Sequence, residues 1–402
     1  MIHPATYRPK PTPKKRRKAW LVLPILLIGV SSYNYLRPLP APTASVTVSG
    51  LSASSTPDIA WPSTGQAAIG APGYDVLGSY GQQQPLATAS IAKVILALCV
   101  LQKQPFDSGE AGATYTVSAD DVTIYENYVA QNGSVAAVSE GERLSEYQAL
   151  QALMLPSANN VADSLVTWVF GSHAAYQTFA TSYLSAHGLA STTIGSDASG
   201  YDASTVSTAT DLTKLGLLAL KSPVLMEIAG QRSAVLPVAG TVYNYDTALG
   251  SNGINGLKTG NNDEDPGAFL FTADLRVGSQ RVPVTGAVMN APDLQSALDA
   301  SRRLSDSLLR GFEQVTIAAA GTQVGTMRTA WGGKEAIVTS NQLQLVRWKN
   351  TALSETHTVR ASLDAGSIGS LQISGPGANA KASLLLKHQL PGPGFWWRLT
   401  RH

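Results

Sequence analysis

The sequence of 402 residues predicts an α+β protein, in which a helical cluster packs on an antiparallel sheet and a small β-sandwich domain follows. Helical and strand-like patterns alternate from about residue 57 to residue 315, and the helical ones concentrate in the middle. Two strand-like segments, 268–275 and 281–289, are joined by a short Gly278-Ser279 turn, as in antiparallel pairs. From about residue 316 to residue 402, short alternating strands with Gly and Asn turns predict the β-sandwich.

Three segments precede the first domain. Residues 1–18 are rich in Pro, Lys and Arg and predict a disordered, basic, cytoplasmic tail. Residues 19–36 carry no charge, and at ~1.5 Å per residue they span roughly 27 Å, close to the ~30 Å hydrocarbon core of a bilayer. We therefore expect a single transmembrane anchor, with the N-terminus in the cytoplasm and the domains outside it. Residues 37–56 are rich in Pro, Ser and Thr and predict a linker.

The alternative to an anchor is a signal peptide, which would leave a secreted protein. Its best cleavage position lies near Ala41-Pro42-Thr43-Ala44, where the prolines make a poor recognition site. The sequence therefore favours a retained anchor, and both readings place the domains outside the cytoplasm.

Composition argues against several classes of protein. The net charge is +2, and the basic residues crowd the N-terminus instead of a face that could follow phosphates, so we expect no nucleic-acid partner. The single cysteine, Cys99, excludes an intramolecular disulfide and a Cys-rich metal site. The histidines show no ligand spacing, and we expect neither a metal nor another cofactor.

Lys93 is the only charged residue in the apolar run 90–101, which predicts a helix buried on all sides. A buried, unpaired ammonium is costly and tends to lose its proton, which makes the lysine a base. Ser90 lies three residues earlier, on the same face of the helix. A neighbouring base turns a serine hydroxyl into a nucleophile. The alternative is a lysine whose ammonium reaches the surface.

Two later segments carry similar polar residues. Pro156 ends a predicted helix over 145–154, and residues 157–159 form a turn before the next helix, where Ser157 or Asn159 could simply act as a cap. Lys258 lies in a strand-like segment, where a lysine could simply protect an exposed edge. Each segment alone is a weak signal.

Together, Ser90-x-x-Lys93, Ser157-x-Asn159 and Lys258-Thr259-Gly260 resemble the three motifs of penicillin-binding proteins and serine β-lactamases. The sequences at 141–145, 149–160, 207–212 and 253–260 are similar to those of the low-molecular-mass D-alanyl-D-alanine carboxypeptidases. The resemblance covers about residues 57–315 and implies a catalytic domain with the penicillin-binding/β-lactamase-like fold.

The resemblance also implies a reaction. The chain would remove the terminal D-alanine from a peptidoglycan stem peptide through a serine ester, and β-lactams would act as inhibitors. Ser90 would attack the carbonyl and Lys93 would take its proton. Ser157 would pass the proton to the departing amine, and Asn159 would hold Lys93 and the substrate amide.

The third motif would hold the substrate. Lys258 and Thr259 would bind its terminal carboxylate, and Gly260 would let the strand approach the ligand without a Cβ clash. The backbone N–H groups of Ser90 and Asn261 would form the oxyanion hole. After Gly260 the chain departs from the usual family pattern, because Asn262 and the acids at 263–265 follow Asn261.

Two other functions compete with this one. A class A β-lactamase needs a glutamate base after the second motif, but Glu227 is the only glutamate between Ser157 and Lys258, and it lies in a helical segment. A non-catalytic module that binds cell wall or senses β-lactams would tolerate the loss of motif residues, and none is lost. The aromatic C-terminus at 395–402 is too short for an amphipathic membrane helix. It could touch the membrane surface, but we favour packing between the domains or on the β-sandwich.

Overall fold

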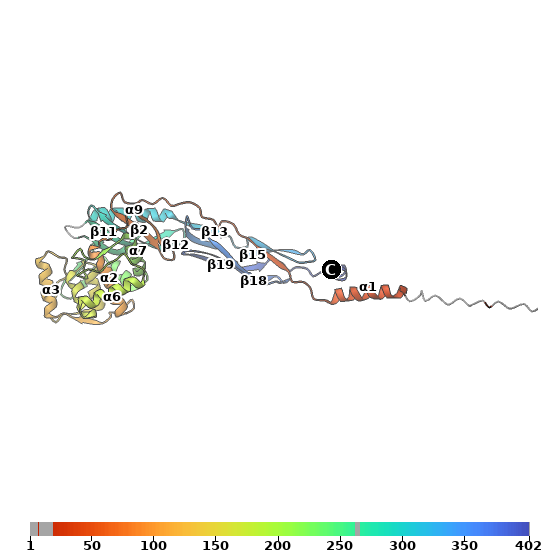
Figure 1. Ribbon diagram of the computed structural model, residues 1–402, viewed down its shortest axis with the longest axis horizontal. Helices are drawn as coiled ribbons and strands as arrows, with labels where there is room; N and C mark the ends of the chain where they lie inside the picture. Colours follow the sequence, from red (N-terminus) through yellow and green to blue (C-terminus); the bar gives the residue numbers. More distant parts are fainter. Residues whose placement is uncertain (1–6, 8–18, 262–265, 402) are drawn as a thin grey trace, which may run out of the picture.

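The computed structural model describes residue 7 and residues 19–261 and 266–401. The described chain is elongated, with a mixed α/β domain at one end, β-sheet in the middle and α1 (Ala19–Leu36) at the other end (Figure 1). The predicted tail, apart from residue 7, and the acids at 263–265 lie outside the described residues.

Helix α1 has the bounds that the sequence predicts, and Pro24 lies inside it. Its described side chains, from Val22 onward, are mostly exposed. Within the described part of the chain, no helix is long and apolar enough to cross a membrane.

The α/β domain is built on a five-stranded antiparallel sheet with the strand order β10-β11-β12-β2-β3. The strands are β2 (Gln66–Ala71), β3 (Asp75–Tyr80), β10 (Ile254–Gly260), β11 (Gly267–Val277) and β12 (Gln280–Ala291). Side chains of β11 alternate between two cores, with Phe269 and Phe271 facing α9 (Leu294–Gly311) and Leu270 facing the remaining helices. The sheet is thus covered on both faces, which confirms the predicted α+β architecture.

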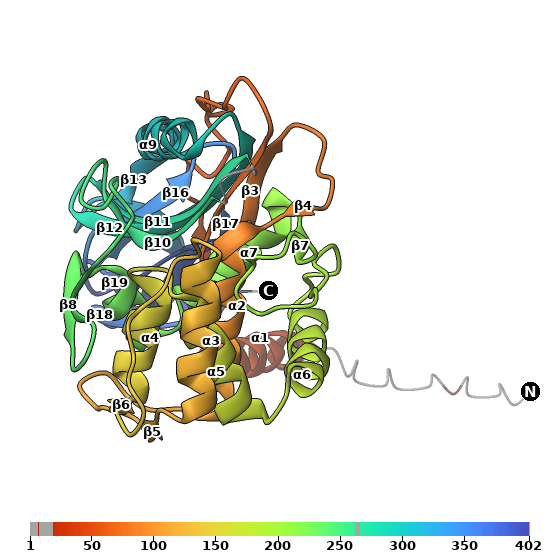
Figure 2. The ribbon, with the colours of Figure 1, turned by 90° about the vertical axis from the view of Figure 1, so that its left-hand side faces the viewer.

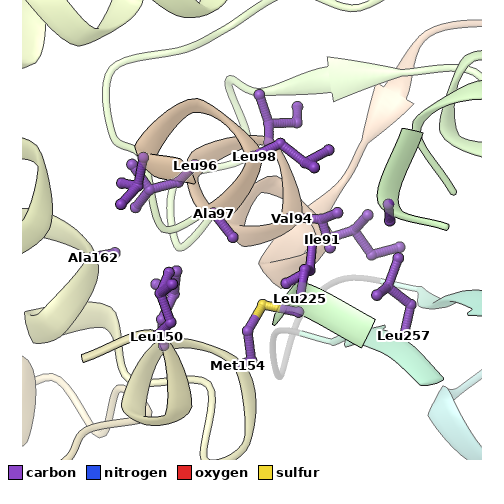
Figure 3. Packing of buried hydrophobic residues seen from close by; sticks show 14 of the residues in the cluster. Ile91, Val94, Leu96, Ala97, Leu98, Leu150, Met154, Ala162, Leu225 and Leu257 are labelled. Carbon is purple, nitrogen blue, oxygen red and sulfur yellow. The ribbon is translucent and has the colours of Figure 1, made fainter. Parts of the chain in front are cut away.

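The helical cluster surrounds α2 (Ala92–Lys103). Every side chain of α2 from Ala92 to Val100 is buried, as the apolar run predicts, and its residues pack against α4, α5, α8 and β10 (Figure 3). The other helices are α3 (Ala119–Ala130), α4 (Glu146–Met154), α5 (Asn159–Phe170), α6 (His173–Ala186), α7 (Ala209–Ala219) and α8 (Pro223–Ala229).

Short antiparallel strand pairs lie in the segments that connect the main helices and strands of this domain. They are β4 (Leu86–Ala87) with β7 (Val206–Ser207), β5 (Thr114–Thr116) with β6 (Arg143–Ser145), and β8 (Ser233–Leu236) with β9 (Gly240–Tyr243). Strand β4 precedes the 3-10 helix η1 (Ala89–Ile91), which leads directly into α2. Figure 2 shows this domain end-on, with α2 among the other helices.

The C-terminal part is β-rich, as the sequence predicts. A six-stranded sheet has the order β1-β14-β15-β19-β18-β17, and β13 pairs with β16. The strands are β1 (Thr43–Val46), β13 (Phe312–Ala318), β14 (Gln323–Arg328), β15 (Lys334–Thr339), β16 (Leu343–Trp348), β17 (Ser354–Val359), β18 (Gly366–Gly375) and β19 (Ala378–Leu386). Strand β13 begins where α9 ends, so the two parts join without a linker.

The segment 37–56 differs from the linker that its composition predicts. Strand β1 pairs antiparallel with β14 at the edge of the six-stranded sheet. Beyond β1, the carbonyl of Leu51 accepts from the backbone of Leu353 at 2.7 Å, and Ser52 accepts from the buried Arg347 at 2.7 Å. A Pro-, Ser- and Thr-rich segment gives no strand signal of its own, and the free edge of β14 provides the partner.

The C-terminal aromatic residues form a short helix, α10 (Phe395–Thr400), that packs on the end of α1. Arg401 donates from Nε to the carbonyl of Asn34 at 2.7 Å, and the ring of Phe395 lies 5.9 Å from that of Tyr35. Trp397 packs edge-on against Trp331 of the β domain at 5.5 Å. Trp397 thus packs on the β domain, as expected, whereas Phe395 and Arg401 contact α1.

A pair of fragments tests the role of segment 37–56. We expect the fragment 57–402 to unfold at a lower temperature than 37–402, because it lacks β1 and two carbonyl acceptors of Arg347, which is only 4% exposed. At about 1 kcal/mol net per hydrogen bond, the loss amounts to ~2–4 kcal/mol. Thermal denaturation followed by circular dichroism measures it. Equal melting temperatures would show that the segment is a passive spacer.

Candidate active site

Ser90 lies in η1, at the start of the buried helix α2, and its side chain is 8% exposed. The segment is held on the domain by the backbone of Thr88, which donates to the carbonyl of Thr205 at 3.0 Å. Ala89 has a φ of 45°, a left-handed conformation that a non-glycine residue seldom adopts. The chain thus turns sharply just before Ser90, at a position where backbone strain is often found at functional sites.

Lys93 lies one helical turn after Ser90 and is completely buried. Its ammonium donates to the Ser90 hydroxyl at 2.9 Å, to Asn159 Oδ1 at 2.7 Å and to the carbonyl of Ser199 at 2.7 Å. Burial, followed by the charge of Lys258, holds the pKa of Lys93 well below its usual value, against the opposing effect of Asp197 and Asp163. The amine is therefore positioned and tuned to take the proton of Ser90.

The second motif forms the turn between α4 and α5. Ser157 has a φ of 62° and is 3% exposed, and its hydroxyl makes no hydrogen bond with any residue that the structure describes. Asn159 is the first residue of α5, and its backbone donates to the carbonyl of Ser134 at 2.8 Å. The bond from Lys93 to Asn159 brings this turn to the first motif, whereas the Ser157 hydroxyl stays available for another partner.

The third motif lies on β10, an edge strand of the five-stranded sheet. Lys258 is 2% exposed, and its ammonium contacts only its neighbour Thr259, at 3.1 Å from the carbonyl and 3.4 Å from the hydroxyl, within the described residues. A Cβ on Gly260 would lie 2.9 Å from the carbonyl oxygen of Thr88. Gly260 therefore lets β10 approach the segment that carries Ser90, and the close approach of a ligand to this strand stays a prediction.

Asn261 follows β10 and is exposed. The structure thus brings seven of the eight predicted residues into buried positions on three neighbouring elements and places the eighth directly after them. These elements are η1 with α2, the turn before α5, and β10.

A carboxylate behind the third motif acts on Lys258. Burial lowers the pKa of Lys258 to about 7, and the charge of Asp246 opposes that effect. Asp246 is 5% exposed, one of its oxygens accepts from the Ala248 backbone at 2.9 Å, and the other has no hydrogen-bond partner among the described residues. Burial raises the pKa of Asp246 to about 6. Asp246 therefore favours the protonated form of Lys258.

Sequence reasoning missed the loop that supplies Ser199. Asp197 accepts from the backbones of Ser199 at 2.6 Å and Gly200 at 2.7 Å, which fixes the Ser199 carbonyl toward Lys93. Gly200 has a φ of 72°, and a Cβ there would lie 2.0 Å from the carbonyl oxygen of Ala89. The Asp-x-Ser-Gly pattern predicts a turn, but it does not indicate that the Ser199 carbonyl accepts a hydrogen bond from Lys93.

Tyr128 links the elements around Lys93. Its hydroxyl donates to Asp163, one helical turn beyond Asn159, at 3.0 Å, and its ring packs edge-on against Tyr201 at 5.6 Å.

No cluster of three or more His, Cys, Asp or Glu side chains that could hold a metal occurs among the described residues.

Comparisons with known proteins identify the family of the chain. A family model described as D-alanyl-D-alanine carboxypeptidase matches residues 64–293, more than half of the chain. A search of curated proteins with this chain found no match.

Three solved structures share the fold. Penicillin-binding protein 5 from Haemophilus influenzae is 15% identical, with a TM-score of 0.57, and the alignment covers 84% of this chain and 99% of that one. A peptidoglycan synthesis regulatory factor (PBP3) from Streptococcus pneumoniae is 18% identical, with a TM-score of 0.60 and coverages of 83% and 99%. The Streptomyces K15 DD-transpeptidase is 20% identical, with a TM-score of 0.54 and coverages of 63% and 98%.

The pH dependence of acylation tests the role of Asp246. If protonated Lys258 meets a ligand carboxylate, acylation by benzylpenicillin should decline as the pH rises through the pKa of Lys258, about 7 in the free protein. Asp246→Asn removes the charge that raises this pKa, so the decline should begin at a lower pH. Stopped-flow acylation rates between pH 5 and pH 9 measure both profiles.

Benzylpenicillin methyl ester is the matched control, because it lacks the carboxylate. Its profile should be the same in the variant and the wild type. Identical benzylpenicillin profiles would exclude an effect of Asp246 on the charge of Lys258, and equal shifts with both compounds would indicate a general change in the site.

Proposed function

This chain belongs to the D-alanyl-D-alanine carboxypeptidase family of serine peptidases, and we propose that it removes the terminal D-alanine from peptidoglycan stem peptides. The observation that carries the proposal is the contact of the buried Lys93 ammonium with the Ser90 hydroxyl at 2.9 Å. A base with a lowered pKa, in hydrogen-bonding contact with a serine, supports a nucleophilic role for that serine.

In the first step Ser90 Oγ attacks the carbonyl carbon of the penultimate D-alanine while its proton passes to Lys93. The new C–O bond turns the carbonyl oxygen into an oxyanion, which the backbone N–H groups of Ser90 and Asn261 would stabilise. The position of Ser90 at the start of α2 supports this assignment, since backbone N–H groups at a helix start lack intrahelical partners.

In the second step the C–N bond breaks and free D-alanine leaves, with its amine taking a proton through Ser157. The Ser157 hydroxyl has no hydrogen-bond partner among the described residues, which supports this role, because a proton relay needs a free donor and acceptor. Lys258 and Thr259 would hold the terminal carboxylate of the substrate, which would add a charged partner to a buried ammonium whose hydrogen bonds among the described residues go to Thr259. Water then cleaves the ester and restores Ser90.

Penicillin would acylate Ser90 by the same attack on its strained amide. The β-lactamase alternative gains no support from Glu227, whose carboxylate accepts from Tyr147 on α4 at 2.8 Å and makes no described contact with the motif residues. A module that only senses β-lactams would share the acylation but would not release D-alanine.

Release of free D-alanine from a defined pentapeptide tests the proposal. Ser90→Ala should abolish both release and labelling by fluorescent penicillin. Lys93→Ala should lower the rate of release at least ~100-fold, within the usual range for a general base. The control is Lys103→Ala, at the exposed end of the same helix, which should keep wild-type rates.

Two results would contradict the proposal. Labelling that persists in Ser90→Ala would place the nucleophile elsewhere. Wild-type labelling without any release of D-alanine would favour the sensing module.

We also propose that residues 19–36 hold the protein at the membrane, with the catalytic domain outside the cytoplasm. The exposed aliphatic side chains of α1, among them Leu23, Ile25 and Ile28, support this placement, as do the basic residues that precede it in the sequence. The full chain should sediment with membranes and require detergent for release, whereas 37–402 should be soluble with unchanged turnover. A full chain that is released by salt alone, or that is shortened to a secreted form, would overturn the anchor.

A further inference from the structure

The hairpin of β8 and β9 presents apolar side chains to solvent. Ser233 pairs with Tyr243 and Val235 pairs with Thr241, so these side chains share one face, while Ala234, Leu236 and Val242 on the other face join the buried core. Val235 is 73% exposed and Tyr243 is 65% exposed. The solvent face of an antiparallel hairpin is usually polar, so this face calls for an explanation.

Neighbouring residues extend the exposed surface. Val238, in the turn between the strands, is 44% exposed, and Tyr245, just after β9, is 49% exposed. No residue from 233 to 245 carries a charge, and the charged groups next to the hairpin include the exposed Arg232, directly before β8, and Glu142, which accepts from the Val238 backbone at 3.1 Å. We call Val235, Val238, Tyr243 and Tyr245 the hairpin surface.

The hairpin is anchored next to the second motif. The backbone of Tyr245 donates to the carbonyl of Leu155 at 3.3 Å, two residues before Ser157. The side chain of Asn244 donates to the carbonyls of Ala229 and Gln231 at 3.0 and 2.9 Å. Figure 2 shows β8 at the outer edge of the catalytic domain. Tyr245, at the base of the hairpin, is therefore fixed beside the segment that leads into the second motif, whereas Val238 lies at the turn beside Glu142.

Charge and shape indicate the partner. A stem peptide carries carboxylates and an amine, which the four uncharged side chains of the hairpin surface do not match. The N-acetylated sugar rings of a glycan strand are neutral, with apolar ring faces and hydroxyl groups at their edges. Tyrosine rings offer flat apolar area at little cost in side-chain entropy, together with a hydroxyl that can donate and accept hydrogen bonds.

We propose that the hairpin surface binds the neutral glycan backbone of the strand whose stem peptide occupies the site. The proposal rests on the proposed function, because it takes peptidoglycan as the substrate. It makes Tyr243, Tyr245, Val235 and Val238 determinants of specificity that contact the substrate away from the reacting atoms. A membrane would be a poor occupant, because the hairpin belongs to the domain at the opposite end of the molecule from α1 (Figure 1).

Two substrates with the same stem peptide test this role in the full chain. One is the free pentapeptide, and the other is the pentapeptide on an N-acetylated disaccharide. In the double variant Val235→Ser with Tyr243→Ser, KM for the disaccharide substrate should rise about five- to tenfold, in line with the loss of an aromatic contact. KM and kcat for the free pentapeptide should stay at their wild-type values.

The single variant Tyr243→Phe, with Val235 unchanged, should keep the wild-type KM for the disaccharide substrate, since the ring face is preserved. Leu309→Ser, which alters an exposed apolar residue on α9, is the matched control and should leave both substrates unaffected. Binding of an N-acetylglucosamine tetramer, measured by calorimetry, should weaken in the double variant and not in the control.

The outcomes separate this inference from the proposed function. In the double variant, an equal rise in KM for both substrates, or no rise for either, would overturn glycan binding. Release of D-alanine by the wild type would still support the proposed function. A dimer of the wild type that the double variant abolishes, in sedimentation, would assign the surface to a second copy instead. Absence of D-alanine release from both substrates in the wild type would overturn the function itself.

Discussion

The buried ammonium of Lys93 is the constraint on which the rest of the catalytic domain depends. None of its described hydrogen-bond acceptors is a carboxylate, and the three that it has come from Ser90, Asn159 and Ser199. Neutral acceptors satisfy the donors without adding a full countercharge, so the low pKa that burial produces is preserved. One side chain therefore joins η1, the start of α5 and the 197–200 loop, and sets the geometry of the site.

The site also requires that two backbone segments approach the residues just before Ser90 closely. The carbonyl oxygens of Thr88 and Ala89 lie where a Cβ on Gly260 or Gly200 would clash, so both positions need glycine. These contacts press β10 and the 197–200 loop against the segment that presents Ser90. Lys258 is thereby buried near enough to Lys93 to lower its pKa, while Asp246 keeps the Lys258 ammonium from losing its own proton too easily. Two lysines on one site can thus serve different purposes, one as a base and one as a cation.

The β domain is more closely tied to the N-terminal segment than a tether would be. Strand β1 completes the edge of the six-stranded sheet, Arg347 holds the carbonyl of Ser52, and Arg401 binds the end of α1. The end of α1 and the short helix α10 therefore meet at the end of the β domain that lies away from the catalytic domain (Figure 1). Motion of α1 relative to the β domain would have to break these contacts, so the N-terminal segment is part of that domain and not a free tether.

Much of this protein could be predicted from local sequence. The charge-free surroundings of Lys93 specify a buried helix, Pro156 specifies where α4 ends, and the alternation at 268–289 specifies paired strands, because such patterns act through neighbouring residues. Tertiary structure alone decided that Ser199 accepts from Lys93, that Asp246 acts on Lys258 and that β1 joins β14. These contacts join residues far apart in the chain, and a carbonyl group or an isolated aspartate carries no sequence signal of its partner. The sequence contains the chemistry of the site, whereas its electrostatic tuning arises only when the three elements are packed together.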